Sequence, residues 1–316
     1  MISRSRRLIL VTASSATGLA GLVLGRRLIR AHEPERAVKD RPPYRIQADE
    51  KVGPAVRRIA AAQLDLALGR LGDFAPMDEE AIHDARKALK RTRALLRLSR
   101  DLLGTETFRR ENHNLRDAGL ALSGVRDAQV LQETLIKLDL EVGDWSAAPG
   151  DTGGARGRRQ AISAVSETRL RVTLWPLPQD GHLSALAPGY RRIYRQGRRG
   201  LARVRAEPSD PHWHELRKRA KDLWHASQLL KAAHPRRMGK MAKRAHRLSD
   251  LLGDDHDLVV LADHARRKLP AEDPRLDRLA AAITRRRSEL QREALELAGH
   301  LYRRKPQKAL HRLHLL

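Results

Sequence analysis

The sequence of 316 residues contains no cysteine, which excludes a disulfide framework and thiolate chemistry and suits a reducing compartment. Only ten residues are aromatic (four Trp, four Tyr and two Phe), so the chain has few of the stacking platforms that binders of single-stranded nucleic acid use. No stretch of four to eight residues alternates convincingly with β-branched residues, and no sheet is expected.

Positive charge is what the sequence has in excess. Lys and Arg number 63 against 38 Asp and Glu, which gives a net charge of +25 and a pI near 11.3. A polyanion is therefore the expected partner: nucleic acid, an inorganic phosphate polymer or an anionic membrane. Because aromatic residues are scarce, we expect the ligand to be recognised by charge rather than by base. With 41% hydrophobic residues, the chain can also bury a core that suits two packed halves.

The first 43 residues differ from the rest. Residues 8–25 form an uncharged run of 18 residues between arginine pairs, and as a helix this run spans about 27 Å, which is marginal for a bilayer. Three interpretations stay open: a membrane anchor, an extension without a role, and an export signal suggested by the Ser-Arg-Arg sequence before the run. Prolines then predict a linker that separates residues 1–43 from a domain over 44–316.

Nearly every segment after residue 43 is predicted to be helical, since proline and acidic residues mark helix starts and glycine marks helix ends. The expected helices cover approximately 54–71, 78–103, 106–122, 127–140, 158–174, 184–206, 210–233, 237–252, 258–268 and 274–304. A linker rich in glycine at 143–157 divides the domain into a first half, 44–142, and a second half, 158–316. The expected fold class is all-α, with two antiparallel four-helix bundles related by internal duplication and a pseudo-two-fold axis.

Cations recur at helical spacing in one stretch of each half. The first basic row is His83, Arg86, Lys87, Lys90 and Arg97, and the second is His214, Arg217, Lys218, Lys221 and His225, about 131 positions later. At about 100° per residue, the first row occupies roughly a third of a helix circumference, with apolar residues opposite. A single row of this kind is usually a solvated helix face. Its repetition behind a leading histidine favours a binding site.

A second motif repeats at a matching distance. Residues 122–127 read Leu-Ser-Gly-Val-Arg-Asp and residues 252–257 read Leu-Gly-Asp-Asp-His-Asp, an offset of 130. Two motifs in the same order and register predict a duplication. Asp127 and Asp257 follow turns predicted from the neighbouring glycines, where a helix cap is the expected role and orientation of a nearby arginine is the alternative.

The paired pattern His-x-x-Arg-Lys-x-x-Lys, followed about 40 residues later by Leu-[Ser/Gly]-x-x-x-Asp, resembles the CHAD family, the conserved-histidine α-helical domain, over residues 44–316. The resemblance implies two four-helix bundles around a central basic cavity that binds inorganic polyphosphate, and a cytoplasmic location that for several members is the polyphosphate granule. It places the first four residues of each basic row in that cavity, together with Arg126. His256 stands at the position of this arginine in the second copy. Further residues predicted to bind polyphosphate are Arg93, Arg97, Arg116, His225, Lys243 and Arg247.

The chemistry supports this interpretation. A linear polyphosphate carries about one negative charge per phosphate and no base, so a binder needs many converging donors; arginine supplies bidentate forks and lysine a mobile point charge. Two rows that line one cleft deepen its positive potential. Nearby cations lower the pKa of a histidine and a bound phosphate restores it, which predicts tighter binding below about pH 6.5.

Two other functions remain as alternatives to a non-enzymatic binder that needs no metal or cofactor. The Asp-Asp-His-Asp sequence at 254–257 resembles the metal-binding dipeptide of HD-type phosphohydrolases, which would cleave phosphoanhydrides. The equivalent positions of the first half, Val125 and Arg126, argue against a dedicated metal site. The other alternative is nonspecific binding of nucleic acid or an anionic surface by bulk charge. Membrane association through residues 8–25 and the oligomeric state stay open.

Overall fold

The structure is a computed structural model, and the residues it describes are 44–47, 49–72, 79–122, 134–135, 138, 154–232, 234–270 and 272–312. They belong to one compact unit that begins at Tyr44. The uncharged run at 8–25 and most of the helix expected at 127–140 lie outside the described residues. Within the described ranges there is no strand, and no helix there is long and apolar enough to span a membrane. The predicted all-α fold class is confirmed.

Helices make up most of the described chain. They are α3 (Val52–Leu71), α4 (Glu79–Leu98), α5 (Arg100–Leu103), α6 (Thr105–Ala121), α8 (Gly154–Arg171), α9 (Ala187–Ala206), α10 (Asp210–Leu229), α11 (Pro235–Lys268), α12 (Pro274–Leu301) and α13 (Pro306–Arg312), with short 3-10 helices at Val172–Leu174 and Leu183–Leu186. Proline lies in the first turn of α9, α10, α11 and α12, where no intrahelical N–H is needed. Asp273 caps α12 by accepting a hydrogen bond from the backbone N–H of Arg275.

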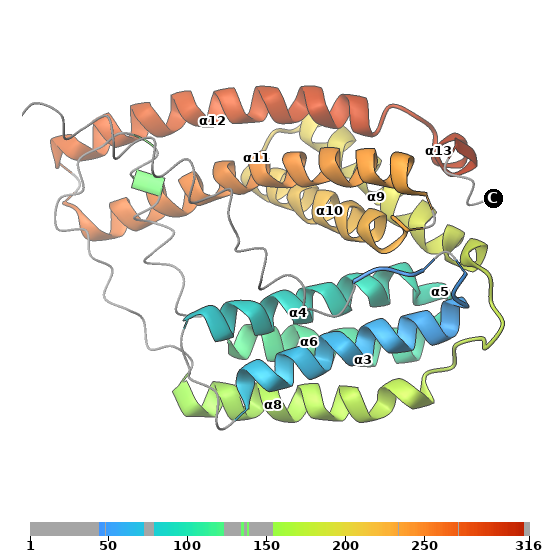
Figure 1. Cartoon of the computed structure of the whole chain (residues 1–316). Coiled ribbons are helices and arrows are strands. Elements are labelled where there is room, and N and C mark those ends of the chain that lie inside the picture. The colour runs from blue at the N-terminus through green and yellow to red at the C-terminus, as the bar shows by residue number, and fades with distance from the viewer. Residues whose placement is uncertain are drawn as a thin grey trace, which may run out of the picture. The chain divides into compact units, whose positions relative to one another are not determined.

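These helices pack as two groups of four (Figure 1). The first group is α3, α4, α6 and α8, the second is α9 to α12, and α4 packs against α10 where the groups meet. The predicted linker at 143–157 places the segment of α8 in the second half of the sequence. In the structure, α8 packs on α3 and α6 of the first group. The boundary in packing therefore falls between α8 and α9. The internal duplication and its two-fold axis stay predictions.

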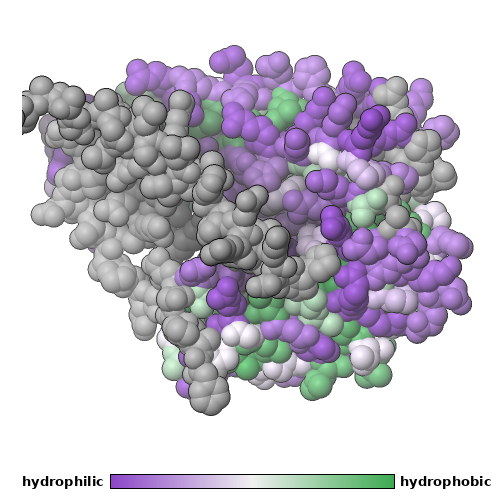
Figure 2. Space-filling model, viewed as in Figure 1, coloured by the Kyte–Doolittle hydropathy of each residue, from purple (hydrophilic) through white to green (hydrophobic). Residues whose placement is uncertain are grey.

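The amphipathic pattern of the first basic row places α4 as expected. Ala85, Ala88, Leu89, Leu95 and Leu96 are almost completely buried in the core. The cations of the row lie on the other side of the helix, where they are exposed or half-buried. Figure 2 shows that hydrophilic residues lie along α12 and over the described surface where the two groups meet.

Helix α11 corrects one prediction. The sequence placed a turn at 252–257 between two helices, but α11 runs unbroken from Pro235 to Lys268. A Cβ atom at Gly253 would lie 3.3 Å from the guanidinium of Arg217, so the absence of a side chain at this glycine lets the arginine approach the helix closely. A glycine inside a helix costs about 1 kcal/mol relative to alanine, and the packing of α11 outweighs that cost. Asp257 consequently lies inside a helix, and its prediction as a helix cap is wrong.

The start of α9 holds the end of α4. Gly189 approaches so closely that a Cβ atom there would lie 1.8 Å from the carbonyl oxygen of Leu98. One turn later, Arg192 donates to the carbonyl of Arg97 at 2.8 Å and pairs with Asp101. A cation therefore satisfies a backbone acceptor at the negative end of α4, which ties the two groups together.

Candidate anion-binding site

The two basic rows lie on α4 and α10, and His225 shows that they converge. Burial, and then the charges of Arg91, Lys221, Arg97 and Lys90, lower the pKa of His225 to about 3. Three of these cations belong to α4 and one belongs to α10. Charges from both helices thus act on one imidazole, as expected if the rows face the same space.

Aromatic rings hold His225 in place. Its ring stacks on Trp224 with centroids 4.6 Å apart, and Tyr44 meets it edge-on at 5.9 Å. The hydroxyl of Tyr44 donates to the carbonyl of Arg91 at 2.8 Å, and the guanidinium of Arg91 lies 5.3 Å from the tyrosine ring. Nδ1 of His225 is buried and has no hydrogen-bond partner within the described part of the chain. The imidazole is therefore neutral at physiological pH.

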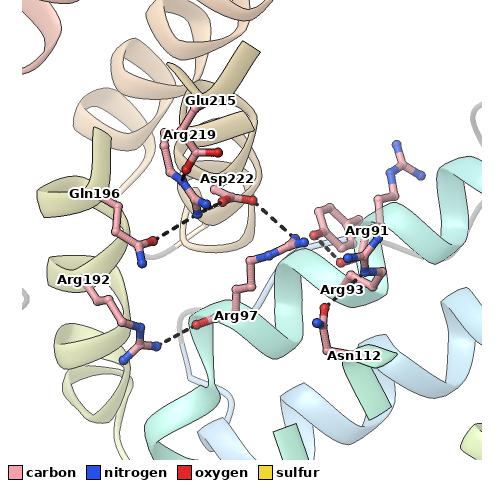
Figure 3. A network of polar contacts seen from close by, with 10 residues as sticks. Arg91, Arg93, Arg97, Asn112, Arg192, Gln196, Glu215, Arg219 and Asp222 are labelled. Atoms are coloured by element: carbon pink, nitrogen blue, oxygen red, sulfur yellow. Dashed lines mark hydrogen bonds and ion pairs between the residues drawn. The ribbon is translucent and has the colours of Figure 1, made fainter. Parts of the chain in front are cut away.

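A buried carboxylate joins the two rows at one end (Figure 3). Asp222 of α10 lies 3.3 Å from Nη1 of Arg97 on α4 and 3.0 Å from Nη1 of Arg219. Arg219 also contacts Glu215 at 2.7 Å and Gln196 at 3.2 Å. Burial raises the pKa of Asp222, although Arg97 and Arg219 act to lower it. Arg97, predicted as a phosphate ligand, thus also has a structural role.

At the other end of the second row, two histidines meet. The rings of His214 and His256 lie 4.7 Å apart. Burial, followed by the charges of His256, Lys218 and Arg217, lowers the pKa of His214 to about 4. Burial and then Arg217 also lower the pKa of His256. The segment at 252–257 therefore lies beside the second basic row.

Asp255 of the same segment connects α11 to α12, a role that the sequence analysis did not predict. This buried carboxylate accepts hydrogen bonds from Nε of Arg287 and Nε2 of Gln291, both at 2.9 Å. Arg287 also pairs with Asp210 at the start of α10. The spacing of Arg287 and Gln291 by one helical turn is the signal that the sequence offered. No group of three or more metal-ligating side chains occurs within the described ranges.

Four predicted residues line a pocket of about 170 Å³ between α4 and α6. Arg86, Lys90, Arg93 and Arg116 surround it, with Leu89, Leu115, Gly119 and Leu120. Arg93 donates to Asn112 at 3.1 Å, and burial followed by the charge of Arg97 lowers its pKa to about 10. Arg86 donates to the carbonyl of Leu122 at 3.3 Å, and Arg116 pairs with Asp117 at 2.9 Å.

The remaining predicted residues are more dispersed. His83 is exposed near the start of α4, and Lys87 is half-buried one turn later. Lys218 is exposed and lies 3.8 Å from Glu215. On α11, Lys243 is exposed and Arg247 pairs with Glu293 of α12 at 2.8 Å. Arg126 lies outside the described residues.

Fold and site together define an all-α protein whose two cationic helices meet beside the half-buried His225. A family model of the CHAD domain matches residues 58–266, and the chain belongs to this family, which is associated with polyphosphate binding or triphosphatase-like activity. The crystal structure of the CHAD domain from the plant Ricinus communis is similar in fold, with a TM-score of 0.52 and 17% sequence identity over 87% of this chain and 96% of that chain. No curated protein matches the sequence.

Proposed function

We propose that the protein binds inorganic polyphosphate between the two basic rows, without catalysing its cleavage. The observation that carries this proposal is that the two rows meet: Arg97 of α4 lies 3.3 Å from Asp222 of α10, and cations of both helices lower the pKa of His225. Like charges placed together are costly unless an anion neutralises them, and a chain of phosphates supplies one charge after another along such a path. Arginine and lysine are the side chains that meet phosphate oxygens best.

The test is a titration of the full chain with polyphosphate of defined lengths. The row variant, Lys90→Gln/Lys218→Gln/Lys221→Gln, removes three cations that act on His225, His214 or His256. We expect its affinity to fall by about 10-fold to 100-fold, since a hydrogen bond to a charged group contributes about 1.5–3 kcal/mol and the mobile ligand recovers part of this.

A control variant matches this loss of charge. Arg267→Gln/Lys268→Gln/Arg285→Gln removes three exposed cations from α11 and α12. It should bind polyphosphate within about threefold of the wild type, as expected for distant charges screened by salt. Equal losses in the row and control variants would contradict a dedicated site.

Bulk charge is the second candidate, favoured by the net charge of +25. Competition separates it from the first: a site between the rows should retain long-chain polyphosphate in excess duplex DNA, whereas a general basic surface should exchange one for the other. Hydrolysis is tested in the same samples by orthophosphate release with Mg²⁺ or Mn²⁺. We expect no release of orthophosphate, because Asp255, the buried carboxylate of the Asp-Asp-His-Asp sequence, already accepts hydrogen bonds from Arg287 and Gln291.

For the location, we propose the cytoplasm and polyphosphate granules, with membrane tethering through residues 8–25 as the alternative. A fluorescent fusion of the full chain should coincide with stained polyphosphate. If a membrane fraction holds the protein and loses it when residues 1–43 are deleted, tethering explains the location instead.

A further inference from the structure

The geometry points to a second anion site, formed by α9, α11, α12 and α13, that binds a compact ligand carrying three or more phosphates. We call it the α13 site. It is separate from the two basic rows, since no described residue of α4 or α10 lines it. Polyphosphate binding between the rows is neither required for it nor implied by it.

The main part of the α13 site is a cavity of about 440 Å³. Its cationic lining is Arg237, Lys240, Arg244, His300, Arg303 and Arg304, and its apolar lining includes Tyr194 and Leu301. No carboxylate is among the described residues that line it. A cavity of this volume is typical of small-molecule sites. Five permanent cations in its described lining favour a ligand with several negative charges.

A second cavity, of about 570 Å³, lies where α9 meets the start of α13. Arg191, Arg195, Arg198 and Arg199 line it, again with no carboxylate among its described lining residues. The spacing of these arginines by three to four residues puts them on one stripe of α9, which binding between the basic rows does not use. The cationic surface thus extends from α11 across α13 to α9.

The two cavities share a fixed wall. Arg198, which lines one, donates to the carbonyl of Arg304, which lines the other, at 2.7 Å. The hydroxyl of Tyr194 donates to the carbonyl of Leu301 at 3.1 Å. Burial raises the pKa of this tyrosine, and the charges of Arg198, Arg304 and Arg303 oppose the increase. These cations are therefore gathered at one point before any ligand binds, which reduces the entropy lost on binding.

The lining favours phosphates over bases. Tyr194 is 1% exposed and Leu301 is 4% exposed, so neither offers an open face on which a base can stack. An open cavity of a few hundred Å³ suits a compact ligand better than a rigid duplex, whose phosphates follow an extended surface. The common chemistry is a cluster of phosphates, which an inorganic oligophosphate, a nucleotide or a phosphorylated polyol supplies.

Calorimetric titration of the full chain tests the α13 site with three probes: tripolyphosphate, ATP and inositol hexakisphosphate. The α13-site variant, Lys240→Gln/Arg244→Gln/Arg303→Gln, replaces three exposed cations that form no ion pair with another described residue. We expect it to lose at least about tenfold in affinity for the tightest of the probes, and to bind long-chain polyphosphate within about threefold of the wild type. The row variant should show the reverse pattern, and the control variant should resemble the wild type.

The outcomes separate the two proposals. If the α13-site variant binds all three probes as the control variant does, the α13 site is wrong whatever the row variant shows. If the α13-site variant loses affinity only for duplex DNA, the α13 site is also wrong, because the surface would then be a contact for nucleic acid. If the row variant binds long-chain polyphosphate as tightly as the wild type while the α13-site variant loses affinity for its probes, the proposed function is wrong and the α13 site stands. Circular dichroism checks folding, and the single variants Lys240→Gln and Arg244→Gln should each lose about threefold if the triple variant unfolds.

Discussion

His225 lies in a stack of aromatic rings surrounded by cations, so its folded-state pKa of about 3 is far below the ordinary value of 6.5. The folded protein consequently binds fewer protons at this site than the unfolded chain. Stability from the neutral imidazole is present above about pH 6.5 and is lost as the pH falls toward 3. We expect the urea midpoint to decrease from pH 7 to pH 5, and to decrease less in His225→Phe, which preserves the stacking. Identical pH dependence in both proteins would contradict this role.

His214 predicts how binding depends on pH. Its pKa is about 4 without ligand, and a bound polyanion must raise it, so binding takes up a proton. Affinity for polyphosphate should therefore increase as the pH falls from 8 to 5.5, and the increase should be smaller in His214→Asn. A flat affinity over this range, measured by titration at constant ionic strength, would exclude coupling to the histidines.

Asp222 predicts a large effect on stability. Asp222→Asn leaves Arg97 and Arg219 without their shared carboxylate, and the loss of one partner from a buried ion pair costs about 3 kcal/mol. Asp263→Asn is the matched control, because Asp263 forms an exposed pair with Arg266 and should cost less than about 1 kcal/mol. Chemical denaturation measures both. Comparable losses would show that Asp222 is not the joint between α4 and α10.

At the scale of the elements, the contact between α9 and α4 depends on a glycine. Gly189→Ala forces a Cβ atom against the carbonyl of Leu98 and should destabilise the protein by about 1–3 kcal/mol. Gly69→Ala, in an open position of α3, should instead stabilise it by about 0.5–1 kcal/mol. Thermal unfolding separates the two variants by sign. A stabilised Gly189→Ala protein would mean that α9 and α4 are not in tight contact.

Periodicity predicted most of the elements, because helix formation and amphipathicity depend on residues within a few positions of one another. It found α3, α6, α10 and α12 close to their observed bounds, and it assigned the buried and cationic faces of α4 correctly. It failed at 252–257, where glycine and aspartate suggested a turn and long-range packing keeps α11 continuous. It also missed α13.

At the scale of the whole molecule, charge governs association, so the salt dependence of affinity reports on the number of phosphate contacts. Each phosphate-contacting cation that is removed should reduce the slope of log affinity against log salt by about 1. For polyphosphate we expect Lys221→Gln to show this reduction and Arg285→Gln to keep the slope of the wild type. Equal slopes for the two variants would assign binding to the charged surface as a whole.

The sequence alone determined the helical class, the two cationic rows and the matching distance from each row to the motif that follows it, since all of these are patterns along the chain. Tertiary structure alone decided that Asp222 neutralises Arg97, that Arg287 occupies Asp255, and that arginines of α9 meet those of α11 and α12 beside α13. The physical reason is that a charge acts on whatever lies within a few ångströms in space. Packing brings together residues that lie far apart in the sequence, such as Arg97 and Asp222.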